Sequence, residues 1–231
     1  MLKRCLLPAL VLATCFSCAT TGQTKQAALH YKLGLARWES GQYQQAYVQF
    51  RKALEDRSDY KQAWNALGCI YMKWDDERGA EDAFTKAIDI DPDYSGAYNN
   101  RCLLEYRLKK YERAVSDCKQ ALSNPLYQTP ENAFFNLGLA YYKLGKYELA
   151  VNAFRQATIR MDDFYPAYYQ LALAYNAEAD YGDAATALQL AVRLDPRFRG
   201  DMAKAQDAFQ KGEGIPVGKE ETPSLMQIFN Y

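Results

Sequence analysis

Apolar residues recur along this chain at a helical spacing of about three to four positions, in segments of about a dozen residues joined by short polar turns. The stretch NLGLAYYKLGKYELAVNAF at residues 136–154 is typical, because two such segments meet at Gly145 and Lys146 and alanines stand where a core normally holds larger side chains. Small residues allow two helices to approach closely. The pattern therefore predicts pairs of short antiparallel helices.

The small residues recur in steps of 34, 34, 36 and 34 positions. One column consists of Ala46, Ala80, Ala114, Ala150 and Ala184, and a second of Ala53, Ala87, Ala121, Ala157 and Ala191. A third column is small at Gly34, Gly68, Cys102, Gly138 and Ala172, and a fourth is mostly large and apolar at Phe50, Phe84, Cys118, Phe154 and Leu188. Because one helix pair cannot bury its own apolar face, consecutive pairs are expected to stack.

The second repeat carries the fullest motif, which consists of Trp64, Leu67-Gly68, Tyr71, Ala80, Phe84, Ala87 and Pro92. With it the chain resembles the tetratricopeptide-repeat (TPR) family. The resemblance implies an all-α fold, a TPR α-solenoid that winds its helix-turn-helix repeats into a right-handed superhelix. We expect five repeats, at 27–60, 61–94, 95–128, 131–164 and 165–198.

Two further segments follow the repeats. The apolar stripe of Met202, Ala205 and Phe209 predicts a C-terminal capping helix within 199–211. Residues 212–231 are expected to form a disordered tail, because their first part is rich in glycine, proline and charge. A short docking segment is the alternative, since the tail ends in the apolar sequence SLMQIFNY.

The N-terminal sequence predicts a signal peptide over residues 1–18, because basic Lys3 and Arg4 precede an apolar run and then small residues. Its end resembles the lipobox of bacterial lipoproteins, with Cys18 as the preferred acyl acceptor, Cys15 as the alternative, and a polar tether at 19–26. A cleaved signal without lipid is the remaining possibility. No aspartate follows either cysteine, so the resemblance implies palmitate-type acylation and an outer-membrane location facing the periplasm.

Charge and motifs argue against several other functions. Lys plus Arg and Asp plus Glu both number 28, so no overall charge draws the chain toward nucleic acid. The single histidine, His30, is expected to pack between helices, and no glycine-rich phosphate loop or nucleophile elbow is present. We therefore expect no enzyme, no cofactor, no metal site and no small-molecule substrate.

Cys102 and Cys118 are predicted to face each other across the turn near Lys110. In an oxidising compartment they can form a disulfide, which closes a loop of about 15 residues and contributes about 3 kcal/mol. Two buried free thiols are the alternative, and Cys69 is left unpaired in either case.

In the TPR superhelix the first helix of each pair lines the concave face. The predicted groove consists of Tyr31, Leu35, Trp38, Asn65, Cys69, Met72, Asn99, Leu103, Tyr106, Phe135, Leu139, Tyr142, Tyr169, Leu173 and Asn176, with Lys73, Arg107 and Lys143 as a basic margin. We interpret it as an open apolar surface for a protein partner, although the winding of the chain or its tail can also cover it, and the three cations can equally be a solvated edge.

The chemistry of this groove favours an amphipathic helix or an extended apolar segment as ligand. TPR domains that grip a terminal carboxylate use a Lys and an Asn in the first repeat, where this chain has Tyr31 and Leu35. Trp38, Tyr106 and Phe135 are the expected anchors.

The segment LYQTPENAFFNLGLAYYKLGKY, together with the lipobox and tether, is similar to the PilF/PilW/Tgl group of type IV pilus lipoproteins. The resemblance implies a pilotin, which binds secretin subunits and holds them at the outer membrane during ring assembly. That family usually has six repeats, whereas five are predicted here. A general cell-envelope adaptor that recruits murein enzymes or proteases is the alternative, and an enzyme is the third.

Overall fold

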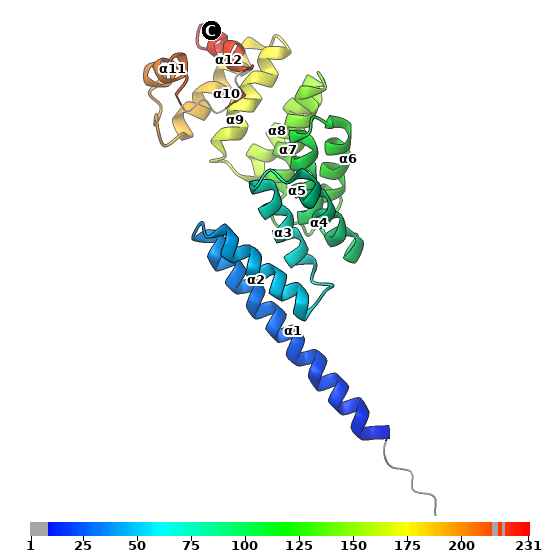
Figure 1. Ribbon diagram of the computed structural model, residues 1–231. Coiled ribbons are helices and arrows are strands. Elements are labelled where there is room, and N and C mark those ends of the chain that lie inside the picture. Colours follow the sequence, from blue (N-terminus) through cyan, green and yellow to red (C-terminus); the bar gives the residue numbers. More distant parts are fainter. Residues whose placement is uncertain (1–8, 214–216, 219) are drawn as a thin grey trace, which may run out of the picture. The chain divides into compact units, whose positions relative to one another are not determined.

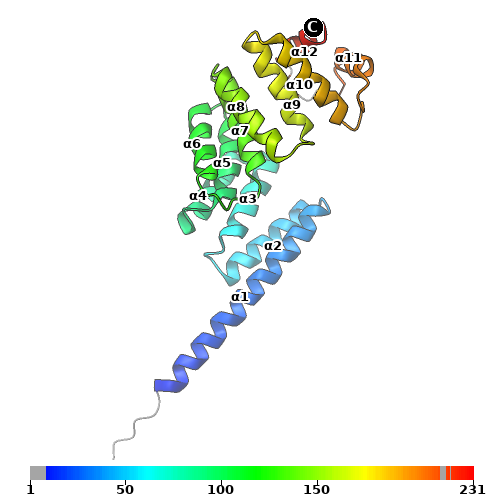
Figure 2. The same ribbon diagram turned by 180° about the vertical axis from the view of Figure 1, so that it is seen from behind.

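The computed structural model describes the main chain of residues 9–213, 217–218 and 220–231, and side chains from Gly22 onward within those ranges. Every regular element in these ranges is an α-helix (Figures 1 and 2). The chain divides into two compact units, residues 1–97 and residues 98–231.

The first unit contains two antiparallel helix pairs that pack in chain order. Its helices are α1 (Ala9–Glu39), α2 (Tyr43–Asp56), α3 (Lys61–Lys73) and α4 (Glu77–Ile90), followed by the first residues of α5 (Ser95–Arg107). The second unit holds the remainder of α5 with α6 (Tyr111–Leu122), α7 (Pro130–Lys143), α8 (Tyr147–Arg160), α9 (Tyr165–Ala177), α10 (Tyr181–Leu194), α11 (Met202–Gln210) and α12 (Thr222–Ile228).

Each helix pair turns through one residue with positive φ. These residues are Gly41, Asp75, Lys109, Gly145 and Ala179, with φ between 57° and 71°. In all five turns the next N–H donates to a carbonyl five residues earlier at 2.8–3.0 Å. The turn with Asp75 therefore has the same form as the glycine turns, although its sequence departs from the usual pattern, and Asp76 then caps α4 by accepting from the Gly79 N–H at 2.9 Å.

The tightest contact inside each pair joins a small residue of the first helix to a residue sixteen positions later in the second. A Cβ added to Gly34, Gly68 or Gly138 would lie 2.4–2.5 Å from the ring of Phe50, Phe84 or Phe154. In the fifth repeat the same two positions hold Ala172 and Leu188, both fully buried. The large side chain of one helix thus lies directly against the backbone of its partner.

In the third repeat these two positions are Cys102 and Cys118, which form a disulfide with their Cα atoms 5.4 Å apart. A covalent bond thus occupies the place that a phenylalanine fills in other repeats. Cys69 is a described cysteine outside the disulfide, and burial raises the pKa of its thiol to about 12, which keeps the thiol protonated at neutral pH.

The start of the first repeat differs from the prediction. Helix α1 begins at Ala9, so neither the tether at 19–26 nor the boundary at 27 is separate from the first helix. Alanine, glutamine and lysine in this stretch favour a helix, and no proline interrupts it. The structure describes side chains only from Gly22 onward, so the lipidation predictions for Cys15 and Cys18 lie outside the described residues.

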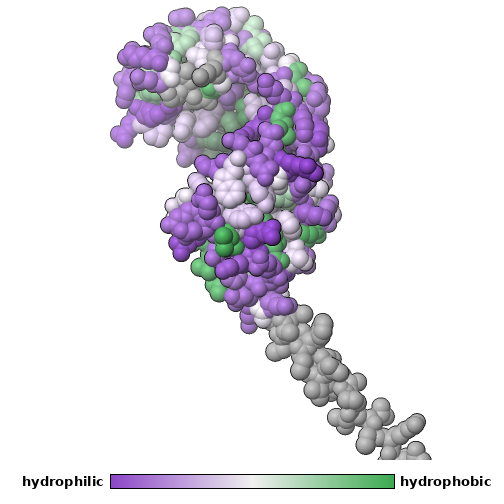
Figure 3. Space-filling model, in the orientation of Figure 1, coloured by the Kyte–Doolittle hydropathy of each residue, from purple (hydrophilic) through white to green (hydrophobic). Residues whose placement is uncertain are grey.

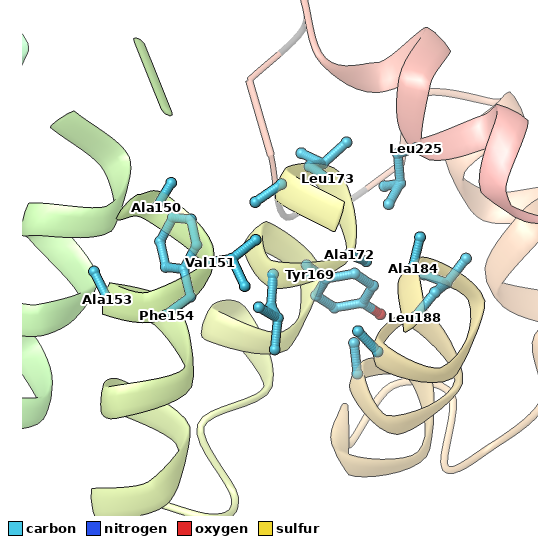
Figure 4. Close-up of a cluster of buried hydrophobic side chains, with 14 of the residues drawn as sticks. Ala150, Val151, Ala153, Phe154, Tyr169, Ala172, Leu173, Ala184, Leu188 and Leu225 are labelled. Atoms are coloured by element: carbon cyan, nitrogen blue, oxygen red, sulfur yellow. The ribbon is translucent and has the colours of Figure 1, made fainter. Parts of the chain in front are cut away.

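The prediction of a disordered tail over 212–231 is wrong for residues 222–228, which form α12. Pro223 suits the first turn of a helix, and Leu225 and Ile228 then fall on one face and are buried. Leu225 lies among the side chains of α9 and α10, near Leu173 and Ala184 (Figure 4). The glycine-rich start of the tail predicts disorder more strongly than the short apolar stripe of Leu225 and Ile228 predicts a helix.

We expect Gly138→Ala to lower the free energy of unfolding by about 1–2 kcal/mol, because its new Cβ overlaps the Phe154 ring, a cost that outweighs the gain in helix propensity. Adding Phe154→Leu, as in the fifth repeat, should recover part of that loss, so a double-mutant cycle by urea unfolding should give a favourable coupling. Gly182→Ala is the control, since a Cβ there meets no atom within 4 Å, and it should not destabilise. If the effects of Gly138→Ala and Phe154→Leu on the free energy of unfolding were simply additive, the close contact between these two positions would be contradicted.

Replacing both Cys102 and Cys118 by alanine should lower the free energy of unfolding by about 3 kcal/mol, because the unfolded chain regains the freedom of the closed loop. Urea unfolding with and without a thiol reductant measures this: the reductant should destabilise the parent chain and a Cys69→Ser control alike, and leave the double variant unchanged. If the parent chain, the Cys69→Ser control and the double variant were equally stable with and without the reductant, the disulfide would be contradicted.

Candidate functional site

The predicted groove residues lie on the first helices of the repeats, which are α1 and α3 in the first unit and α5, α7 and α9 in the second. The structure divides them into three groups. Some present an aromatic ring at a turn, some are buried in the core, and some lie under the C-terminal segment.

An aromatic pair recurs at the turn of three repeats. Trp38 contacts Tyr43 with ring centroids 5.1 Å apart, Tyr106 contacts Tyr111 at 5.7 Å, and Tyr142 contacts Tyr147 at 5.4 Å. The leading ring of each pair is half-buried. Each therefore keeps an accessible part while the second ring limits its orientation, so the role of Trp38 and Tyr106 as anchors stays a prediction.

Other groove residues of the first unit also contribute to its core. Tyr31 is half-buried between Phe50 and Tyr60, at ring distances of 5.7 and 5.2 Å. Asn65 donates to the Tyr94 hydroxyl at 3.4 Å, and Leu35 is exposed. Cys69 and Met72 are half-buried. The accessible apolar surface here is thus centred on Leu35 and Trp38.

In the second unit, Phe135 packs against both Phe154 and Phe164 at ring distances of 5.9 and 5.1 Å. This predicted anchor therefore supports the interior as well as the surface. Leu103 and Leu139 are half-buried.

Asn99 does not belong to an open surface. Its side chain is buried, and its carbonyl oxygen accepts a hydrogen bond from the Asn136 amide at 3.0 Å. Two buried amides that satisfy each other cost little, so the pair joins α5 to α7.

Tyr169 and Leu173 also lie in the core, which corrects their placement in an open groove. Both are fully buried, and α11 and α12 supply the residues that cover this end of the unit (Figure 4). Tyr169 contacts the Phe209 ring at 5.8 Å, and its hydroxyl donates to Asp195 at 3.3 Å. The Tyr169 side chain thus faces the capping helix α11 through Phe209.

The three cations of the predicted margin have different surroundings. Lys73 lies with its ammonium 5.0 Å from the centre of the Tyr43 ring, Arg107 is exposed, and Lys143 forms ion pairs with both Glu220 and Glu221. Burial alone lowers the pKa of Lys143, but its two carboxylate partners outweigh that effect and raise it. Lys143 is thus a fixed positive charge.

A cavity of about 200 Å³ lies beside this lysine. Its lining combines aromatic, basic and C-terminal residues: Tyr106, Arg107, Lys109, Tyr111, Leu139, Tyr142, Lys143, Gln170, Gly218, Glu220 and Glu221. Burial raises the pKa of Tyr106 and Tyr142, so both phenols stay neutral at neutral pH. Glu220 and Glu221 were missed from the sequence, where they stand inside a charged stretch with no periodic signal.

Within the described residues, no group of three or more histidine, cysteine or acidic side chains is arranged to hold a metal ion. His30 instead contacts Gln49 at 2.9 Å between α1 and α2. None of the helices in the described part combines the length and the apolar character needed to cross a bilayer.

The face drawn in Figure 3 is mostly hydrophilic, with small separate apolar areas. Exposed large apolar residues are few on the predicted groove, Leu35 among them. The predicted groove therefore exposes a few rings and charges rather than a broad apolar patch.

The geometry defines a class: stacked antiparallel helix pairs with a repeated aromatic position form a helical-repeat protein, an architecture that typically presents an extended surface to protein partners. Tetratricopeptide-repeat family models match residues 27–55, 61–94, 131–158 and 165–198, which together are more than half of the chain. The chain belongs to the tetratricopeptide-repeat family.

The type IV pilus assembly protein PilF of Pseudomonas aeruginosa is 30% identical to the chain over 118 residues, which are 51% of this chain and 47% of PilF. The match thus spans about half the length of that relative. Among solved structures, Pseudomonas aeruginosa PilF aligns with a TM-score of 0.71 at 24% identity, covering 90% of this chain and 98% of PilF. PilW, a type IV pilus biogenesis factor, aligns with a TM-score of 0.67 at 23% identity, covering 86% and 98%.

We expect Asp195→Asn to make the chain less sensitive to acid. Burial raises the pKa of Asp195, but hydrogen bonds from Arg197 outweigh this and hold it below its ordinary value. A carboxyl whose pKa is lower in the folded state stabilises above its unfolded pKa of about 4, and that contribution is lost as pH falls through the folded value.

Urea unfolding at a series of pH values from neutral to strongly acidic measures this effect. The parent chain should lose more stability on acidification than the Asp195→Asn variant, while Asp162→Asn, at an exposed carboxylate, should behave like the parent. Parallel pH profiles of the parent and Asp195→Asn would contradict the role of this carboxylate.

Proposed function

We propose that this chain is a lipid-anchored scaffold on the periplasmic face of the outer membrane that binds a protein partner along its first helices, as a pilotin-like factor for type IV pilus secretin assembly. The observation that carries the proposal is the recurring half-buried ring at the turn, in Trp38, Tyr106 and Tyr142. Tyr106 and Tyr142, which stand on consecutive repeats of the second unit, suit a partner segment that presents apolar side chains at regular intervals.

The disulfide supports an oxidising location. Disulfides persist in the bacterial periplasm and are rare in the reducing cytosol. Cys102 and Cys118 occupy a fully buried position in the second unit. A periplasmic location also agrees with the signal sequence and with the pilus role of PilF.

Lipid on Cys18 would give the scaffold its mechanical role. A single acyl chain binds a membrane only marginally, whereas several chains on one cysteine hold a protein firmly. A partner bound by the repeats is then confined near the bilayer, at a high effective concentration. Subunits that must assemble into a ring at the membrane gain most from this confinement.

Deleting the gene tests the pilotin role, with secretin multimers and surface pili as the readouts. We expect the multimers and the pili to be lost, and both to return with the parent gene but not with Cys18→Ser. Mass spectrometry of the purified chain should find the acyl groups on Cys18, with Cys15→Ser as the matched control. Normal multimers in the deletion strain would remove the pilotin role and leave a general envelope adaptor.

Trp38→Ala and Tyr106→Ala should each weaken capture of the secretin subunit by about tenfold, which corresponds to about 1.4 kcal/mol for a buried aromatic anchor. A pull-down with graded concentrations of the chain measures the change. Leu149→Ala is the control, because Leu149 is exposed on the second helix α8, and its binding should match the parent. Loss of helical signal in the two ring variants would show that these rings serve the core instead.

A further inference from the structure

The described part of the C-terminal segment, residues 217–218 and 220–231, lies on the second unit. Its helix α12 packs against α9, α10 and α11, as the two ribbon views show (Figures 1 and 2). Leu225 is fully buried and Ile228 is 2% exposed, and both belong to the main hydrophobic cluster of this unit. The apolar face of α12 therefore covers α9, a first helix that the repeat pattern assigns to the partner-binding side.

The charged residues at the start of the segment form a second contact with the repeats. Lys143, from the basic margin, contacts both Glu220 and Glu221, and the Glu221 side chain is only 9% exposed. Tyr106 and Tyr142, two of the recurring rings, line the same cavity as these carboxylates. Glu220 and Glu221 thus lie beside Lys143, in the basic margin of the predicted groove.

Tyr231 forms an aromatic pair like those at the turns of the repeats. Trp38, Tyr106 and Tyr142 each cover the ring five residues later, but the fifth repeat has Asn176 at that position. There the covering ring is Tyr231, whose centroid lies 4.7 Å from that of Tyr181 and whose hydroxyl bonds to Asn176 at 3.2 Å. The segment thus supplies the ring that the fifth repeat lacks.

From these three contacts we propose that residues 217–231 are an internal ligand, and that a protein partner displaces them with a segment of the same chemistry. That chemistry is two adjacent carboxylates followed directly by a short helix, whose first buried apolar residue comes four positions after the second carboxylate. The inference rests on the proposed function in one respect, namely that a protein partner binds this side of the repeats.

The segment is suited to exchange. A helix of seven residues is marginal alone in water, so its contacts with α9 and Lys143 hold it in place. In the sequence, glycine stands at 212, 214 and 218 between α11 and α12, and glycine admits more backbone conformations than other residues. A partner that offers the same contacts shifts the population toward the undocked tail.

The test uses the full chain and a fluorescent peptide with the sequence of residues 217–231, measured by fluorescence anisotropy. In a release variant, Leu225→Asp with Ile228→Asp, the chain's own tail can no longer dock. We expect this variant to bind the peptide at least tenfold more tightly than the parent chain. The control is Leu149→Asp with Ile159→Asp, which adds the same charge at exposed positions of α8 and should bind as weakly as the parent.

A charge exchange tests the acidic pair. Adding Lys143→Glu to the release variant should abolish binding of the peptide, and a peptide with lysine at positions 220 and 221 should restore it. Should the release variant fail to fold by circular dichroism, the full-length variant Glu220→Lys with Glu221→Lys, which leaves the apolar face intact, takes its place with the same expectation.

Equal binding by the parent and a folded release variant, or failure of the charge exchange, would overturn the proposal. So would a parent chain that is dimeric by light scattering while the release variant is monomeric, because the segment would then belong to a second copy. The peptide test and the secretin test can fail separately. If the release variant binds the peptide but the deletion strain has normal secretin multimers, only the pilotin role is rejected. If the deletion strain loses its multimers but the release variant does not bind the peptide, only the internal ligand is rejected.

Discussion

The close approach of two helices within each repeat is the constraint on which this structure depends. At one position per repeat the first helix carries a small residue, because a buried side chain of the second helix lies against its backbone. The partners change together: glycine faces phenylalanine at Gly138 and Phe154, whereas alanine faces leucine at Ala172 and Leu188. Between these two repeats the summed volume of the pair changes less than either residue does, which preserves close packing of the two helices.

That regularity explains why the repeats could be predicted from the sequence. Small residues at fixed steps, such as Ala46 and Ala80, are buried in contact with other helices and therefore repeat whenever the geometry repeats. The helix pairs of 61–94 and 165–198 follow directly from this periodicity. The turn at Asp75 was less evident, because the backbone hydrogen bond that closes it is independent of the side chain.

The binding surface was less predictable. A repeat pattern tells which helix faces the concave side, but it does not tell what else covers that side. Tyr169 and Asn99 occupy positions equivalent to surface residues, and both are buried through contacts with parts of the chain distant in sequence, Phe209 for one and Asn136 for the other. The segment around Leu225 carries only one helical turn of apolar spacing, too short to distinguish from a loop before its receiving surface is known.

The disulfide of the third repeat makes the stability of this repeat depend on redox conditions. Where other repeats hold a phenylalanine against glycine, this one holds two buried sulfur atoms joined by a covalent bond. With both thiols reduced, the two small apolar side chains would still pack together, but the covalent link between α5 and α6 would be lost. Oxidation thus tightens this repeat through a bond, whereas the repeats with phenylalanine against glycine are held by packing that does not respond to redox conditions.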